Sequence, residues 1–519
     1  MEEKNNKKDD GSCTTVAEIN GNAFYSVSSS LPPEILVNIF SYFSDSIKDL
    51  ILCAQVNQVW HHIITSFYIW RTVKFNKFET FSRFHDVLQL IAKTRINRAL
   101  DNWSRFVEAY LNVIESSTSE TSEEVEGEEG KYVVTSISFT KPTYFHSTKF
   151  YGHYVKKLDL SGIQGKNLIT EEMLCDLFPN IPNLENINLY NCYMITDKVI
   201  KKLTKSCCHL NKLKLFGCMS LTSRSLYWIE TRCPKLTTLN IGFCTNITQR
   251  ALQSLLTRCK ELTSLTISYC TNIPAISLIP MVKNLQGLRK LYMHSSHTSD
   301  LIVKNIISHI PKLRKLDLGA SSPKLTDATS EIISQHCPNL VYLCLSSSLI
   351  TNEGLRKIAQ GCKKLSFIDL SGCYMIEDGI SDFLNYCPEL KIIHLNSLLK
   401  ISGKSFSAII KSNHIEYASF SSSKILEIPS DDLPSSDDER SRSKIKKLIL
   451  NNCDISENNL RQIAYWCKNL EYLDINLVCY LNDNILQILC DHLENLKEVV
   501  ARNCFRGIVC LSEFKLSSF

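Results

Sequence analysis

Cysteine is the residue type in this chain that most invites a chemical role. The chain has 22 cysteines among 519 residues, and thiols can bind metal ions, form disulfides or act as nucleophiles. The stretch CPKLTTLNIGFCTNIT, residues 233–248, encloses a Leu-x-x-Leu-x-Ile run between two of them. Which chemistry these thiols have depends on the elements that position them.

The same run of apolar residues recurs fourteen times, with copies 25 to 30 residues apart. Within a run, apolar and polar residues alternate, which predicts a short strand with one buried face. A helical pattern follows, as at Leu252 and Leu255 after the expected N-cap Thr248. One unit cannot bury its apolar face alone, so we expect a stacked, right-handed solenoid. The runs begin at Val155, Leu184, Leu210, Leu236, Leu262, Leu288, Leu313, Leu340, Leu365, Leu390, Ile415, Ile445, Leu470 and Leu496.

Fourteen of the cysteines recur at two fixed positions of this repeat. Seven follow the first residue of a run by eight positions, where the chain leaves the strand, and seven precede it by three, at the inner end of the helix. Both positions predict small buried side chains, so packing is the expected role of these thiols. The first set is Cys192, Cys218, Cys244, Cys270, Cys373, Cys453 and Cys504, and the second is Cys207, Cys233, Cys259, Cys337, Cys362, Cys387 and Cys467.

The other thiol chemistries fit the sequence less well. No Cys-x-x-Cys pair of the kind that binds zinc occurs, so we expect no metal site and no cofactor. A disulfide between neighbours such as Cys244 and Cys270 is geometrically conceivable. However, the N-terminal stretch MEEKNNKKDDGS has no signal-peptide core, which favours a reducing compartment. A catalytic cysteine would need an accessible, electropositive setting rather than a core position.

Composition narrows the choice of partner and compartment. No window approaches about 18 consecutive apolar residues, so we expect no membrane partner. The formal net charge of +5 is small for this length and argues neither for nucleic acid nor for a membrane surface, so we expect no nucleic-acid partner. We therefore expect a protein of the cytoplasm, the nucleus or both.

The repeat has a recognisable signature. Cys-Pro-x-Leu, followed by Leu-x-Leu-x-x-Cys and then Ile-Thr, resembles the cysteine-containing subclass of leucine-rich repeats over roughly residues 155–504. The resemblance implies an α/β leucine-rich-repeat horseshoe of about fourteen strand–helix units. Some units depart from the pattern at the position of the first cysteine set, with Ser296, Ser321, Ser348, Ser423 and Leu398.

A second pattern lies upstream in LPPEILVNIFSYFSDSIKDLILCAQVNQVWHHIITSFYIW, residues 31–70. These forty residues carry more apolar side chains than so short a segment can bury, so they must pack against something else. The order Leu-Pro-x-Glu-Ile-Leu, Ile-Phe, Cys-x-x-Val-x-x-x-Trp and a final Trp resembles the F-box.

The F-box resemblance implies docking on a Skp-type adaptor and, through it, on a cullin-RING ubiquitin ligase. Val56, Trp60 and Trp70 would divide between internal packing and the interface. The alternative is that the segment only caps the N-terminal end of the solenoid. The residues that would face the adaptor are Leu31, Pro32, Ile35, Leu36, Ile39 and Phe40.

These patterns predict four regions: a loose polar tail over 1–29, the F-box over 30–75, a helical linker over 76–154 and the solenoid over 155–519. Within the linker, the acidic segment 116–130 lacks apolar anchors and is expected to be disordered. Within the solenoid, 429–444 is expected to be a polar loop. Its Ser435 and Ser436 precede three acidic residues, so phosphorylation there is a hypothesis beside that of a plain solvated loop.

The third, fifth and seventh positions of each run should face the concave side of the horseshoe. Several carry lysines or aromatic rings, and arginines flank two of the lysines. Such a surface suits an acidic or phosphorylated peptide, although an ordinary solvated face would also explain the lysines. The residues predicted to bind a target are Lys212, Lys214, Phe216, Arg289, Lys290, Tyr292, Arg314, Lys315, Tyr342 and Phe367.

The expected function is that of a non-catalytic substrate receptor of an SCF (Skp–cullin–F-box) ligase, which holds a target protein for ubiquitination and proteasomal degradation. No zinc-RING cysteine spacing, catalytic Cys-His arrangement or phosphate-binding glycine loop provides chemistry of its own. The alternative is a leucine-rich-repeat scaffold or inhibitor that acts outside a ligase, and an RNA-binding solenoid is a more distant third.

Overall fold

The computed structural model describes residues 72–74, 155–162, 169–428, 443–478, 481 and 483–501. The chain divides into two compact units. Strand β1 (Thr72–Lys74) belongs to the first unit, and the repeats from residue 158 onward belong to the second.

Strands of three residues form the inner layer of the repeat unit. Within the described residues fourteen of them, β2 to β15, follow one another in chain order in one sheet, and the pairs from β3 onward with a recorded register are parallel. Each strand starts two residues after one of the fourteen predicted run starts, so the predicted repeat is confirmed. The strands are β2 (Lys157–Asp159), β3 (Asn186–Asn188), β4 (Lys212–Lys214), β5 (Thr238–Asn240), β6 (Ser264–Thr266), β7 (Lys290–Tyr292), β8 (Lys315–Asp317), β9 (Tyr342–Cys344), β10 (Phe367–Asp369), β11 (Ile392–His394), β12 (Tyr417–Ser419), β13 (Lys447–Ile449), β14 (Tyr472–Asp474) and β15 (Glu498–Val500).

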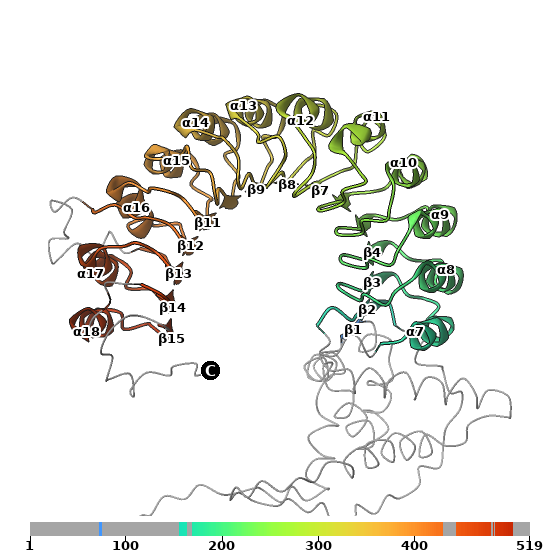
Figure 1. The fold of residues 1–519 in the computed structure, drawn as a ribbon, viewed down its shortest axis with the longest axis horizontal. Coiled ribbons are helices and arrows are strands. Elements are labelled where there is room, and N and C mark those ends of the chain that lie inside the picture. The colour runs from blue at the N-terminus through green and yellow to red at the C-terminus, as the bar shows by residue number, and fades with distance from the viewer. Residues whose placement is uncertain are drawn as a thin grey trace, which may run out of the picture. The chain divides into compact units, whose positions relative to one another are not determined.

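Helices form the outer layer, so that the strands line the concave side of the arc and the helices its convex side (Figure 1). This is the predicted α/β leucine-rich-repeat horseshoe. The described helices are α7 (Glu171–Leu177), α8 (Asp197–Ser206), α9 (Ser223–Arg232), α10 (Gln249–Arg258), α11 (Ile279–Val282), α12 (Asp300–Ile307), α13 (Asp327–His336), α14 (Asn352–Gly361), α15 (Gly379–Tyr386), α16 (Gly403–Ile410), α17 (Glu457–Trp466) and α18 (Asp483–His492), with 3-10 turns at Phe178–Asn180 and Ala275–Leu278. None of the helices within these described stretches combines the length and the apolarity that crossing a bilayer requires.

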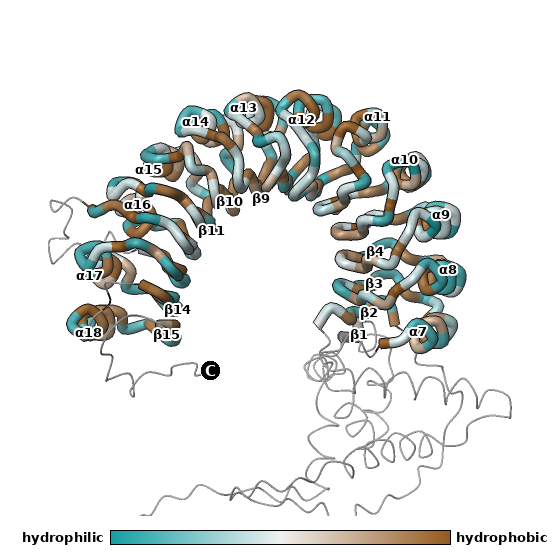
Figure 2. Tube along the Cα trace, in the orientation of Figure 1, coloured by the Kyte–Doolittle hydropathy of each residue, from teal (hydrophilic) through white to brown (hydrophobic). Residues whose placement is uncertain are grey.

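The core lies between the two layers and repeats with the sequence. In the unit that contains β5, Leu236, Leu239 and Ile241 are fully buried, and Leu252 and Leu255 of α10 pack from the helical side. Hydrophobic segments accordingly recur in every strand and helix of the arc (Figure 2). Each unit thus buries its apolar face only by stacking on its neighbours.

Polar side chains at the helix N-termini also join the units. Asp300, in the first turn of α12, accepts hydrogen bonds from the backbone N–H of Thr326 at 3.0 Å and from its hydroxyl at 2.8 Å. The hydroxyl of Thr329 donates a third to the same carboxylate at 2.5 Å. Because Thr326 is the N-cap of α13, one carboxylate serves two helix N-termini. Equivalent pairs are Asp197 with Thr222, and Asp327 with Thr351.

The helical half of one unit departs from the predicted pattern. Between β6 and β7 the chain forms a 3-10 turn after Pro274 and then a single short helix with Pro280 at its start. Proline lacks the N–H that a continuing helix would use and clashes with the preceding turn, so it shortens the helix here.

A left-handed residue follows the last residue of every strand from β3 to β14 by three positions. In these twelve units the residue seven positions after the run start has a positive φ, and only Gly217 and Gly372 among them are glycines. Phe243 and Tyr269 adopt φ values of 61° and 62°, a conformation that costs a bulky L-residue about 1–2 kcal/mol. The tight turn between strand and outer layer imposes this conformation, and it redirects the two rings.

Candidate interaction surface on the concave face

The repeat-locked cysteines are structural. All seventeen described cysteines are free thiols, and the thirteen described members of the two predicted sets are buried. Cys504 lies outside the described residues. Burial raises the pKa of the Cys244 thiol to about 12, so the nucleophilic thiolate is strongly disfavoured there. Packing is therefore confirmed as the role of these side chains.

The buried thiols also make hydrogen bonds that the sequence pattern alone does not reveal. The Cys244 thiol donates to the Leu215 carbonyl of the preceding unit at 3.2 Å. Where serine replaces cysteine at this position, the Ser423 hydroxyl makes the equivalent bond to the Leu395 carbonyl at 2.8 Å. Ser423 therefore keeps the link to the backbone of the preceding unit, whereas the Ser321 hydroxyl donates to the Leu318 carbonyl of its own unit at 2.5 Å.

The basic residues predicted on the concave face lie on neighbouring strands. Lys212 and Lys214 are exposed on β4, and the register places Lys290 of β7 directly beside Lys315 of β8. Arg289 and Arg314 precede these two lysines and are exposed. Together these six residues are called the basic cluster. Within the described part of the chain none of them forms an ion pair.

The charges of the basic cluster act on one another. Burial, and then the positive charges of Lys315, Lys212, Lys214 and Arg314, lower the pKa of Lys290. Residues from β4, β7 and β8 thus share one local field, although the intervening β5 and β6 carry no charge on their outward positions Thr238 and Ser264. A bound anion would relieve this repulsion.

Aromatic rings form two ladders across the strands. The first ring ladder has ring centroids 4.8 to 6.1 Å apart, and the second 4.2 to 6.0 Å. Tyr342 and Phe367 stack within 10° of parallel, and the Lys315 ammonium lies 5.7 Å from the centre of the Tyr342 ring. The first ladder is Tyr190, Phe216, Phe243, Tyr269 and His294, and the second is Tyr292, Tyr342, Phe367, His394 and Tyr417.

The ladders cover positions that the sequence pattern predicts to be free. A side chain added at Gly242 would meet the Phe216 ring at 2.5 Å, and one added at Gly319 would meet the His294 ring at 2.6 Å. Only glycine therefore fits beneath these rings. Ser268 and Ser346, at the same seventh position, are buried as well. The seventh position of these runs is therefore covered, and the concave surface open to a partner is narrower than the third, fifth and seventh positions that the sequence pattern predicts.

Acidic groups lie beside the second ring ladder. The register aligns Asp317 of β8, Cys344 of β9 and Asp369 of β10 at the fifth position. Asp317 accepts a hydrogen bond from His294 over 3.1 Å and by this bond raises the His294 pKa. Burial, and then the charges of Asp317 and Asp369, raise the pKa of the Cys344 thiol. The sequence prediction missed His294 and Cys344 as members of this surface.

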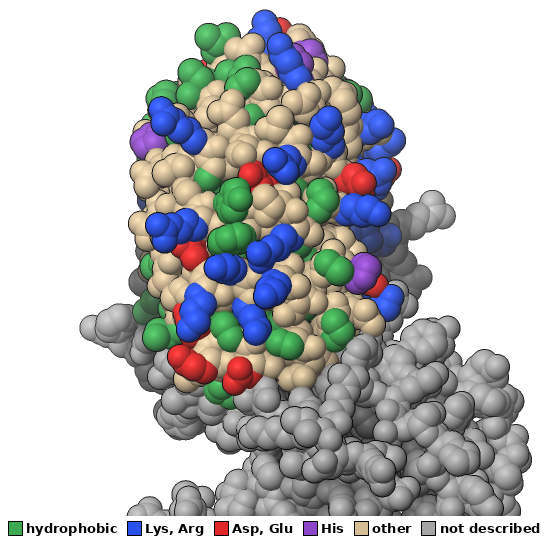
Figure 3. Space-filling view, turned by 90° about the vertical axis from the view of Figure 1, so that its right-hand side faces the viewer, with side chains coloured by type: hydrophobic (Ala, Val, Ile, Leu, Met, Phe, Trp, Pro, Cys, Tyr) green, Lys and Arg blue, Asp and Glu red, His purple; other side chains and the backbone are tan. Residues whose placement is uncertain are grey.

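Positive charge also occurs on the convex side. Figure 3 shows lysine and arginine side chains spread over the outer face of the arc, among hydrophobic and acidic ones. Lys201 and Arg232 lie 4.9 and 4.7 Å from the centre of the Trp228 ring, so some of these cations are engaged in cation–π contacts. The basic cluster therefore differs from the convex face because its positive charges lie close enough to act on one another.

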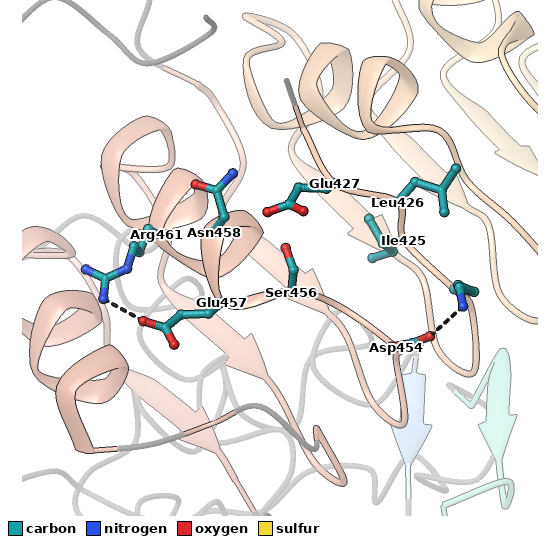
Figure 4. Close-up of a pocket in the computed structure, with 9 residues that line it drawn as sticks. Ile425, Leu426, Glu427, Asp454, Ser456, Glu457, Asn458 and Arg461 are labelled. Atoms are coloured by element: carbon teal, nitrogen blue, oxygen red, sulfur yellow. Dashed lines mark hydrogen bonds and ion pairs between the residues drawn. The ribbon is translucent and has the colours of Figure 1, made fainter. Parts of the chain in front are cut away.

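A pocket of about 680 Å³ lies between the segment after β12 and the start of α17 (Figure 4). Lys424 pairs with Asp454 at 3.2 Å at one end of it, and Arg461 pairs with Glu457 at 2.6 Å at the other. Its two lysine and arginine side chains are thus each paired with a carboxylate, unlike the like charges of the basic cluster.

Comparison with known proteins identifies the upstream segment. Residues 28–76 match the sequence model of the family described as F-box-like. The chain carries an F-box-like domain. The match spans all nine residues predicted for adaptor binding, from Leu31 to Trp70, which themselves lie outside the described residues. No curated protein matches the chain.

Comparison with solved structures also finds matches to this chain. The Rad7–Elc1 complex of yeast is 18% identical, with 70% of this chain and 80% of that chain covered and a TM-score of 0.46. An internalin of Listeria monocytogenes is 18% identical, with 68% and 89% covered and a TM-score of 0.37. A TLR13–ssRNA13 complex is 17% identical, with 67% and 46% covered and a TM-score of 0.37.

The chain therefore joins an F-box-like domain to a leucine-rich-repeat horseshoe. This combination is that of a protein-interaction adaptor, and both kinds of module are typically non-catalytic.

Proposed function

We propose that this protein is the substrate-recognition subunit of an SCF ubiquitin ligase. Its F-box-like domain binds a Skp-type adaptor, which links it indirectly to the cullin-RING scaffold, and its concave face binds a target for ubiquitin-dependent degradation. The observation that supports this proposal is the F-box-like match at residues 28–76 on the same chain as a concave face that carries the basic cluster and the two ring ladders. The protein acts in the cytoplasm, the nucleus or both.

The concave face suits a target segment that is acidic or phosphorylated. Phosphate and carboxylate groups accept charge-assisted hydrogen bonds from lysine and arginine, and Lys290 is surrounded by like charges that an anion would offset. Beside it, the half-buried Tyr292, Tyr342 and Phe367 offer rigid contact area. The chain holds the target near the charged ubiquitin carrier and so contributes proximity and orientation rather than bond chemistry.

Affinity purification of two matched variants tests the proposal. Leu31→Ala/Pro32→Ala/Ile35→Ala should lose the Skp-type adaptor and the cullin but retain bound targets, because only the F-box-like domain changes. Lys212→Ala/Lys290→Ala/Lys315→Ala should retain the adaptor and lose targets.

The decisive measurement is the amount of adaptor recovered with the first variant. An adaptor retained at the wild-type level would refute the ligase role and leave a leucine-rich-repeat scaffold or inhibitor acting outside a ligase. Targets that accumulate under proteasome block only when the F-box-like domain is intact are the expected substrates.

A further inference from the structure

Cys344 differs from the repeat-locked cysteines. Among the described cysteines it is the only one inside a strand, at the last residue of β9. Leu343, its neighbour, points into the core, so Cys344 belongs to the opposite, concave side of the sheet. Its exposed fraction is nevertheless only 2%, since side chains of the adjacent strands enclose it.

Three metal-ligating side chains from three units meet at this thiol. The register aligns Cys344 with Asp317 of β8, and His294 reaches them from the unit of β7. The ligating atoms of His294, Asp317 and Cys344 all lie within 4.8 Å of one another. A fourth ligand is at hand, because an Asp369 carboxylate oxygen lies 3.6 Å from the Cys344 sulfur.

We propose that His294, Asp317, Cys344 and Asp369 bind a zinc ion on the concave face. Thiolate, imidazole and carboxylate are the ligands that zinc takes, usually four in a tetrahedron, and thiolate with imidazole selects against magnesium and calcium. Zinc-to-ligand distances of about 2.0–2.3 Å place tetrahedral ligand atoms on the order of 3.3–3.6 Å apart. Bringing His294, Asp317 and Cys344, whose ligating atoms lie within 4.8 Å of one another, to this spacing requires inward movements of about 1 Å, and the Asp369 carboxylate must turn toward them.

Binding of the ion leaves the ligand set with one net negative charge. The Cys344 sulfur forms a bond to zinc and releases its proton to the solvent. The proton that His294 Nδ1 donates to Asp317 leaves that nitrogen, so that the neutral ring carries its proton on Nε2, and Nδ1 and Asp317 exchange their hydrogen bond for bonds to the metal. The resulting thiolate and two carboxylates carry three negative charges against the two positive charges of zinc. The ion joins side chains from four consecutive units in the middle of the arc, directly beside Lys290 and Lys315 of the basic cluster.

Metal titration of the purified full-length chain tests this site, with Zn²⁺ for stoichiometry and Co²⁺ as a spectroscopic probe. We expect one ion per chain by native mass spectrometry, and a thiolate-to-cobalt charge-transfer absorption that added zinc removes. Cys344→Ser should abolish the absorption and weaken zinc binding at least 100-fold. The matched control is Cys373→Ser, because Cys373 is a buried thiol of the next unit that faces the core, and it should retain both signals.

Asp317→Asn provides a second variant in case Cys344→Ser fails to fold, as judged by circular dichroism. It keeps the thiol and the shape of the side chain but removes one anionic ligand, so zinc affinity should fall at least tenfold. A wild-type chain without a stoichiometric ion would overturn the proposal. So would a cobalt–thiolate signal that survives in Cys344→Ser, because the ion would then sit on another of the chain's thiols. The outcome is independent of adaptor binding.

Discussion

Replacing one buried thiol should change how the stability of the horseshoe depends on pH. Burial raises the pKa of Cys244 from its ordinary 9.0 to about 12. A group whose folded-state pKa is raised contributes stability that is fully present below its unfolded pKa and is lost as pH rises through the folded pKa. The loss from Cys244 should therefore begin near pH 9 and continue to about pH 12.

The magnitude follows from the two pKa values. At pH 10 an unfolded thiol of ordinary pKa is about nine-tenths ionised, whereas the buried thiol is about one-hundredth ionised. This difference favours the unfolded chain by about 1.4 kcal/mol for one cysteine. Cys244→Ala removes the titrating group and also the hydrogen bond to Leu215. The variant should thus be less stable than wild type at pH 7, and this gap should shrink by about 1.4 kcal/mol at pH 10.

Urea unfolding followed by circular dichroism at pH 7, 8, 9 and 10 measures the gap. Leu252→Ala is the matched control, because that side chain is also buried but carries no titrating group, and its gap to wild type should stay constant. A gap for Cys244→Ala that is the same at pH 7 and pH 10 would refute the assignment of this thiol as a neutral, desolvated core group.

Three further outcomes are expected. Asp300→Ala should lower the free energy of unfolding by about 2 kcal/mol, because three hydrogen bonds end on that carboxylate. Urea unfolding should show a smaller loss for Glu331→Ala, whose ion pair is exposed. Leu477→Gly should raise the free energy of unfolding by about 0.5–1 kcal/mol in thermal denaturation. Leu477 has a φ of 57°, a conformation that glycine adopts without the steric cost of a Cβ atom. Leu399→Gly, an exposed leucine outside the left-handed positions, should lower that free energy instead. Lys290→Ala should weaken binding of an acidic peptide about tenfold at low salt and flatten its salt dependence, as fluorescence anisotropy would show; unchanged affinity would exclude Lys290 from recognition.

The architecture was predictable because one signal repeats. Each run carries its own period-2 alternation, and the recurring cysteines mark where each strand and helix ends. Even the shortened helix between β6 and β7 has its cause in the sequence, at Pro274 and Pro280. An error in one unit would not shift the others, since the period fixes all fourteen starts.

The concave surface was less predictable, because side-chain direction there depends on backbone conformation at single residues. Phe243 and Tyr269 lie just past the predicted outward columns, and only their left-handed conformation brings them into the first ring ladder. His294, Asp317 and Cys344 come from three different units, so no short sequence motif predicts that they lie together. Cys344 could have been noticed as a cysteine that breaks the period.

The spacing of the in-register strands sets which residues of a bound extended peptide can contact which strand. Adjacent strands are about 4.8 Å apart, whereas an extended peptide advances about 3.3 Å per residue, so consecutive residues of the peptide do not align with consecutive strands. The path from Lys212 on β4 to Lys290 on β7 crosses three strand steps, or about 14 Å, which such a peptide covers in roughly four residues. Acidic groups at i and i+4 could reach both lysines at once, whereas a pair at i and i+1 could not.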